Sequence, residues 1–142
     1  MTLVIDASAV VAVLVDDGEV GRWAEATLDR QDLAAPHLMP FEAANILRRA
    51  AQRADISDDV ARLAHADLLD LTVELVDYEA LAPRAWALRN SVTVYDAAYV
   101  ALAEALDAPM MTLDLRLARA SGPRCAFLTP SDPPVWEPPL RD

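Results

Sequence analysis

"LVIDASAVVAVLV", residues 3–15, indicates the fold class of this chain. Its first part, LVIDAS at 3–8, is a short apolar run that predicts a buried strand ending at Asp6. The following AVVAVLV predicts a helix, with Ser8 placed to cap its N-terminus. A buried strand that passes directly into a helix is typical of α/β proteins.

Strands and helices are expected to alternate along the rest of the chain. Further strands are predicted at LAAP (33–36), TVELV (72–76), PMMTLD (109–114) and CAFLT (125–129). Helices are predicted at 19–30, at 40–54 from Pro40, at 57–71 from Ser57, over about 78–88, and from near Asp96. This order predicts a three-layer α/β/α fold around a mainly parallel five-stranded sheet.

The composition indicates one soluble domain. The chain has 142 residues and is 54% hydrophobic, but it contains no apolar run of the roughly 18 residues that span a bilayer. The single cysteine, Cys125, excludes an intrachain disulfide, so we expect a cytoplasmic protein without a membrane segment.

We assign residues 1–129 to the domain. Residues 130–142 hold five of the ten prolines and predict an extended tail, which Trp136 could dock onto the body or a second subunit.

The net charge of −11 disfavours indiscriminate binding to nucleic acid, because such binding depends on clustered positive charge. All 12 basic residues are arginines. This usage has two explanations, a GC-rich genome or a need for bidentate contacts to phosphate and carboxylate groups.

Four acidic residues are expected at one edge of the sheet. Asp6 and Asp114 end the first and fourth strands, and the carboxyl ends of parallel strands meet at one rim. Glu42 lies in the first turn of the helix from Pro40, and Asp96 begins its own helix. Right-handed crossovers turn both helix starts toward the same rim.

Each of these acids also has an ordinary explanation as a helix cap, worth about 1 kcal/mol. Four carboxylates on one rim, however, raise one another's pKa unless a cation neutralises them. Mg²⁺ or Mn²⁺ suits a set of oxygen ligands, whereas zinc is disfavoured because His37, His65 and Cys125 are isolated. The sequence therefore favours metal-assisted hydrolysis of a phosphate ester.

Other side chains are candidates for supporting roles. Ser8 and Thr112 flank the acids and could hold a water or a phosphate, or could act as turn formers. Arg49 and Arg53 share a helix face with Glu42 and are candidates for contact with phosphate. Arg116 follows Asp114 and is a similar candidate for contact with phosphate or a partner protein. All three arginines could equally form surface ion pairs.

The helix that begins near Asp96 is expected to be packed by Tyr95 and by the alanines that follow Asp96. This packing would aim the Asp96 carboxylate at the rim of the sheet.

Four motifs in order, VIDASAVVAVL, FEAANILRRA, YDAAYVALA and TLDLRLA, resemble PIN-domain ribonucleases and, more narrowly, VapC-type toxins of bacterial toxin–antitoxin pairs. The resemblance covers residues 3 to about 129. It implies that Asp6, Glu42, Asp96 and Asp114 form the metal-binding and catalytic set, with Asp6 and Asp96 as direct ligands. Ser8 and Thr112 match supporting hydroxyls.

The resemblance further implies an endonuclease that cuts structured RNA such as tRNA or rRNA, a homodimer, and inhibition by a VapB-type antitoxin. Two alternatives remain open. A phosphoaspartyl-type Mg²⁺ phosphotransferase or phosphatase would also place acids at strand ends, but such sites use a lysine and this chain has none. A noncatalytic PIN-like module that binds RNA or a partner would be favoured if one acid were missing, yet all four are present.

Overall fold

A computed structural model describes residues 1–130 of the protein. The predicted tail lies outside the described residues from position 131 onward, and so does Trp136. No helix in the described part of the chain is both long enough and apolar enough to cross a membrane.

One sheet of five strands forms the centre of the fold, and the strands lie in the order β3-β2-β1-β4-β5. They are β1 (Thr2–Ile5), β2 (Asp32–Pro36), β3 (Glu74–Val76), β4 (Met110–Met111) and β5 (Phe127–Leu128). Every neighbouring pair is parallel. The predicted α/β fold class with a parallel five-stranded sheet is confirmed.

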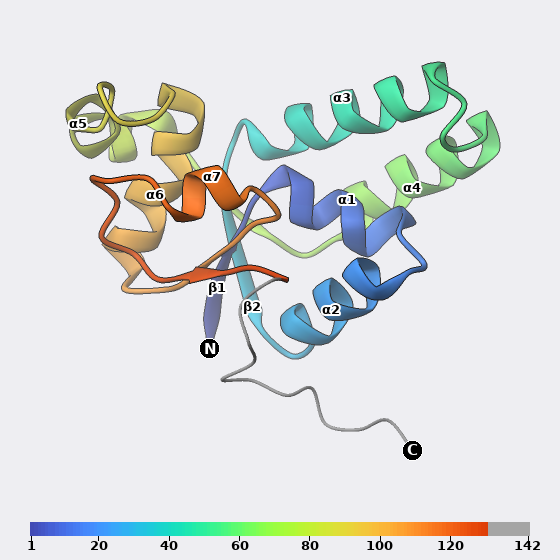
Figure 1. The fold of residues 1–142 in the computed structure, drawn as a ribbon, viewed down its shortest axis with the longest axis horizontal. Helices are drawn as coiled ribbons and strands as arrows, with labels where there is room; N and C mark the ends of the chain where they lie inside the picture. Colours follow the sequence, from blue (N-terminus) through green and yellow to red (C-terminus); the bar gives the residue numbers. More distant parts are fainter. Residues whose placement is uncertain (131–142) are drawn as a thin grey trace.

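Helices cover both sides of this sheet. They are α1 (Ala7–Val15), α2 (Glu19–Leu28), α3 (Met39–Gln52), α4 (Asp58–Asp70), α5 (Tyr78–Ala87), α6 (Val94–Leu106) and α7 (Leu115–Ala118). Figure 1 shows α5 and α6 on one side of β1 and β2, and α1 to α4 on the other. The hairpin of α3 and α4 extends away from the sheet.

The core is built around β1 and α6. Leu3, Val4 and Ile5 of β1 are at most 1% exposed, as expected for a central strand that is covered on both faces. The α6 residues from Ala97 to Ala103 are all buried, and α6 contacts β1, β2 and β4. The alanines let the helix approach the sheet closely, so the first turn of α6, which carries Asp96, has a fixed place beside β1.

Several local predictions were wrong. Helix α1 begins at Ala7 and is capped by Asp6, whose side chain accepts a hydrogen bond from the Ala9 amide, and not by Ser8. The fourth strand ends at Met111, and Asp114 instead caps the short helix α7, which was not predicted. Tyr95 is 67% exposed and does not pack α6.

A partly buried ion pair ties α5 and α6 to the segment after α7. Arg84 Nε lies 2.7 Å from Glu104 Oε1, and their side chains are 30% and 17% exposed. Arg84 Nη2 also donates a hydrogen bond to the Gly122 carbonyl, and the Arg124 amide donates to Glu104 Oε2. The pKa of Glu104 is lowered, since these hydrogen bonds and the arginine charges outweigh its partial burial.

We expect Glu104→Ala to lower the free energy of unfolding by about 2 kcal/mol, because it removes charge-assisted hydrogen bonds from a partly buried site. Urea denaturation of the variant and the wild type measures this difference. Asp67→Ala, at an exposed position on α4, is the matched control and should change stability by less than about 0.5 kcal/mol. Equal stability of Glu104→Ala and Asp67→Ala would show that the ion pair contributes nothing.

Candidate active site

The candidate site lies where the direction of the sheet's connections reverses. Strand β1 pairs with β2 on one side and with β4 on the other, so the chain leaves β1 toward one edge and later returns to build the opposite edge. Ligand sites of open parallel sheets lie at the carboxyl ends of the strands beside such a switch point. Asp6 directly follows β1, and Thr112 directly follows β4. The protein thus belongs to the class of open α/β proteins, in which ligands bind at the carboxyl ends of the strands beside the switch point.

Asp6 is fixed at this rim by hydrogen bonds to both of its carboxylate oxygens. Its side chain is buried, with 8% of the residue exposed. Oδ1 accepts hydrogen bonds from the Ser8 hydroxyl at 2.6 Å and the Ala9 amide at 3.0 Å, and Oδ2 accepts one from the Thr112 hydroxyl. Burial nevertheless raises the pKa of Asp6, and the nearby charge of Asp96 adds to the increase.

Ser8 and Thr112 join the segment after β4 to the start of α1. The Thr112 side chain is fully buried, and its Oγ1 accepts a hydrogen bond from the Asp114 amide at 3.0 Å while donating to Asp6. Ser8 Oγ accepts a hydrogen bond from the Leu113 amide at 3.2 Å. The two hydroxyls therefore hold residues 112–114 in place relative to the Asp6 carboxylate.

Glu42 reaches the rim from the first turn of α3, as predicted. Its Oε1 accepts a hydrogen bond of 2.7 Å from the hydroxyl of Tyr99, which is 2% exposed and lies on α6. Partial burial raises the pKa of Glu42, with further increases from the charges of Asp96 and Asp6.

Asp96 lies in the first turn of α6, also as predicted, but it is not the cap of that helix. The Thr93 side chain is the N-cap and accepts a hydrogen bond from the Asp96 amide at 3.1 Å. The pKa of Asp96 is raised by partial burial and then by the charge of Asp114. Since Thr93 caps the helix, capping does not account for a half-buried carboxylate at position 96.

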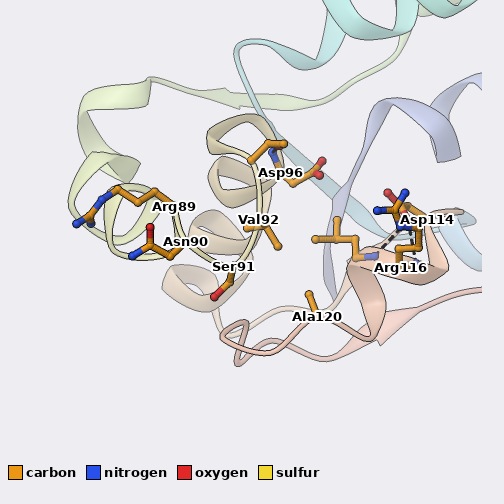
Figure 2. A pocket seen from close by; sticks show the side chains of 10 residues that line it. Arg89, Asn90, Ser91, Val92, Asp96, Asp114, Arg116 and Ala120 are labelled. Atoms are coloured by element: carbon orange, nitrogen blue, oxygen red, sulfur yellow. Dashed lines mark hydrogen bonds between the residues drawn. The ribbon is translucent and has the colours of Figure 1, made fainter.

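Asp114 is more exposed than the other three acids and lies beside an open groove. Its Oδ1 caps α7 by accepting hydrogen bonds from the Arg116 and Leu117 amides. The groove has a volume of about 560 Å³, and both Asp96 and Asp114 line it. Figure 2 shows Asp96 at the α6 wall and Asp114 with Arg116 at the α7 wall.

These four acids are thus brought to one rim, and their charges act on one another. Asp96 raises the pKa of both Asp6 and Glu42, and Asp114 raises that of Asp96. Within residues 1–130, none of the four forms an ion pair with an arginine or histidine. A bound cation would supply the missing positive charge and lower the cost of ionising these groups.

The donors suit a hard divalent cation, because all of them are carboxylate oxygens with hydroxyls nearby. In the described part of the chain, no three Asp, Glu, His or Cys side chains are already gathered as a metal cluster. Mg²⁺ does not require such a cluster, since it commonly binds one or two carboxylates, substrate phosphates and several waters. The residues present therefore fit Mg²⁺ or Mn²⁺.

The candidate arginines are distributed unevenly around this site. Arg116 lines the groove beside Asp96 and Asp114. Arg49 and Arg53 lie toward the other end of α3, about 10 and 16 Å along the helix axis from Glu42. Arg53 pairs with Asp55 at 3.5 Å, and both side chains are about two-thirds exposed. Arg53 therefore forms a surface ion pair, which was the alternative to contact with phosphate.

Two features of the site were missed in the sequence. Tyr99 follows Asp96 by three residues, a spacing that places both on one face of a helix, and this signal could have identified it. Its contact with Glu42 joins positions 57 apart, which no local pattern reveals. One wall of the groove is formed by Arg89, Asn90 and Ser91, which lie in the connection between α5 and α6. This connection has no hydrophobic periodicity, so the sequence did not indicate that these residues line the groove.

Comparison with known proteins identifies the family. A family model described as "PIN domain" matches residues 3–123. Ribonuclease VapC1 of Mycobacterium tuberculosis is 42% identical over 127 residues, which cover 86% of this chain and 92% of that protein. Ribonuclease VapC3 of Pyrobaculum aerophilum is 36% identical over 122 residues, covering 83% and 93%. The chain therefore belongs to the PIN-domain family and, within it, to the VapC ribonucleases.

Solved structures agree with this assignment at the level of the fold. VapBC2 from Rickettsia felis, solved bound to a DNA fragment from its promoter, matches with a TM-score of 0.64 at 13% identity and covers 91% of this chain and 98% of that one. The resemblance noted in the sequence is confirmed, and with it the prediction of a nuclease rather than a phosphoaspartyl enzyme.

Proposed function

We propose that this VapC ribonuclease uses Mg²⁺ or Mn²⁺ to hydrolyse phosphodiester bonds within structured RNA, such as tRNA or rRNA. The observation that carries the proposal is the set of four carboxylates at one rim. Three of them, Asp6, Glu42 and Asp96, have raised pKa values, and none of the four has a cationic partner in the described residues.

Asp6 and Asp96 are the proposed direct ligands, and Glu42 and Asp114 complete the metal-binding and catalytic set. When bound, the metal lowers the pKa of an attacking water and offsets the charge that builds on the phosphoryl oxygens. Asp6 offers a rigid carboxylate, because Ser8, Ala9 and Thr112 donate hydrogen bonds to it. Asp96 and Asp114 face the open groove, where a phosphate of the substrate can approach.

We also propose that the protein is a cytoplasmic toxin, that it forms a homodimer and that a VapB-type antitoxin inhibits it. This part rests on membership in the VapC family and on the resemblance in sequence to VapC-type toxins. The division into a nuclease domain at 1–129 and a proline-rich tail at 130–142 likewise stays a prediction.

The test is an RNA cleavage assay with purified protein that has been separated from any antitoxin. Bulk tRNA and rRNA are incubated with Mg²⁺ or Mn²⁺, with EDTA, and with EDTA followed by excess metal. We expect cleavage that EDTA abolishes and metal restores, and that Asp96→Asn lacks. Cleavage that persists in EDTA, or equal cleavage by Asp96→Asn, would contradict the proposal.

A second prediction concerns Tyr99 as a positioning residue for Glu42. Tyr99→Phe removes the hydroxyl that donates to Glu42 Oε1 and keeps the buried ring. Partners of metal ligands are commonly worth 10–100-fold in affinity, so we expect Mn²⁺ binding to weaken by about 10-fold. Isothermal titration calorimetry measures this change. Tyr95→Phe, which removes an exposed hydroxyl from the same helix, is the control, and equal Mn²⁺ affinities of the two variants would exclude this role for Tyr99.

A further inference from the structure

The groove beside Asp96 and Asp114 has the features of a binding site for part of the substrate. Its lining includes the apolar side chains of Val92, Leu117 and Ala120. Asn90 and Ser91 line the wall formed by the α5–α6 connection, and Figure 2 shows them across from Arg116. A volume of about 560 Å³ is within the range of roughly 300–1,000 Å³ found for pockets that hold small organic ligands.

The polar groups on the α5–α6 wall have unused hydrogen-bonding capacity. Within residues 1–130, the side-chain amide of Asn90 and the hydroxyl of Ser91 form no hydrogen bond with the rest of the chain. An Asn side chain offers donors and an acceptor, which can pair with the edge of an unpaired base. The groove lining therefore combines apolar side chains that a ring can contact with polar groups that can form hydrogen bonds.

The segments on both sides of the groove are basic, in contrast to the rest of the chain. Residues 84–95 and 115–130 contain five arginines and no Asp or Glu, whereas the whole protein has a net charge of −11. Arg84 is paired with Glu104, but Arg89 and Arg116 line the groove itself. This local positive charge is complementary to an RNA backbone, and it lies next to the carboxylates proposed to bind metal.

The outer edge of the groove carries a cationic and aromatic surface. The Arg89 guanidinium lies 4.7 Å from the centre of the Trp86 ring and donates a hydrogen bond to the Trp86 carbonyl. Trp86 is 57% exposed, although it is a large apolar residue. Exposed aromatic rings and stacked arginines are typical of surfaces that bind unpaired nucleotides.

From these observations we infer that the groove binds one unpaired nucleotide of the RNA next to the scissile phosphate. The base lies on Val92, Leu117 and Ala120, with its polar edge toward Asn90 and Ser91. Arg116 contacts the backbone phosphate, and the following nucleotide passes over Arg89 and Trp86. This inference deepens the proposed function, since it depends on RNA as the substrate.

The test measures RNA binding without cleavage. A fluorescein-labelled random-sequence hexaribonucleotide is titrated in EDTA, and its anisotropy gives the dissociation constant. Ala120→Trp fills the groove without altering a proposed ligand, and we expect binding to weaken about 10-fold because the indole occupies the space proposed for the base. Ala66→Trp, at an exposed position on α4, is the matched control and should bind like the wild type. Thermal melting confirms that both variants fold.

A second variant keeps the test decisive if Ala120→Trp does not fold. Arg116→Gln should reduce the slope of log affinity against log salt by about 1 between about 50 and 200 mM salt, as expected for one lost phosphate contact. Arg22→Gln, on the exposed side of α2, should leave the slope unchanged.

Absence of RNA binding by the wild type, or wild-type binding by both groove variants, would overturn the inference. These results are distinct from a failure of the proposed function: a protein that binds RNA in the groove but cleaves none with Mg²⁺ or Mn²⁺ would contradict only the nuclease mechanism.

Discussion

Asp6→Asn is expected to lower the rate of RNA cleavage by about 1,000-fold or more while leaving the protein folded. A metal ion supplies several kcal/mol of charge stabilisation to a phosphoryl transfer, and each 1.4 kcal/mol or so corresponds to a factor of about ten in rate. The neutral amide is a poor ligand for Mg²⁺ compared with the carboxylate. Cleavage of labelled RNA at saturating Mg²⁺ measures the change.

This substitution separates the two roles of Asp6. Asn is as good an N-cap as Asp, and its amide oxygen can still accept the hydrogen bonds from Ser8 and Ala9. Its amide nitrogen can donate to Thr112 Oγ1, in place of the hydrogen bond that Asp6 Oδ2 accepts from this hydroxyl. The substitution also removes the buried charge of the Asp6 carboxylate, whose pKa is raised by desolvation. The thermal midpoint of metal-free Asp6→Asn should therefore stay close to that of the wild type. If the variant cleaves RNA as fast as the wild type, Asp6 is only a helix cap.

Thr112→Val is expected to have the second largest effect, on both stability and activity. Valine has nearly the same shape as threonine, but it cannot donate to Asp6 Oδ2 or accept from the Asp114 amide. Leaving a buried donor or acceptor without a partner costs about 1–3 kcal/mol. Loss of the link between Asp6 and Asp114 should also lower Mn²⁺ affinity about 10- to 100-fold, as for other partners of metal ligands.

Thr112→Ser provides the control, since it keeps the hydroxyl and loses only a methyl group. It should retain most of the Mn²⁺ affinity and cleavage activity that Thr112→Val loses, as measured by calorimetry and by the cleavage assay. A threonine needed only for packing would give the opposite order, with Ser more damaging than Val.

Much of this fold could be predicted because the chain has strong local patterns. The short apolar run before Asp6 indicates a buried strand, and its immediate change to a helical pattern indicates an α/β arrangement. The positions of Glu42 and Asp96 in the first turns of their helices followed from Pro40 and from the apolar run after Asp96.

The errors have physical causes. Asp6 and Ser8 are both good capping residues and lie two positions apart, so capping propensity does not distinguish them. The cap is known only once the structure shows that the helical backbone of α1 begins at Ala7. Helix α7 has four residues, too few to produce a helical period, so TLD was joined to the strand before it. Tyr95 and Tyr99 lie one turn apart, and the choice of which one is buried depends on how α6 rotates against β1.

Specific side-chain contacts between distant segments could not be predicted. Tyr99 meets Glu42 only after α6 has packed against α3. Likewise, Asn90 and Ser91 lie opposite Arg116 only after α7 has packed near the start of α6. Sequence reasoning therefore identified the acidic residues but not the side chains that hold Glu42 or line the groove.

The most direct test of the central claim, that the four-carboxylate rim binds a divalent metal, is calorimetric titration of Mn²⁺ into antitoxin-free protein. We predict saturable binding by the wild type and its loss in Asp6→Asn under the same conditions. No heat of binding in the wild type, or equal binding by the two proteins, would contradict the account.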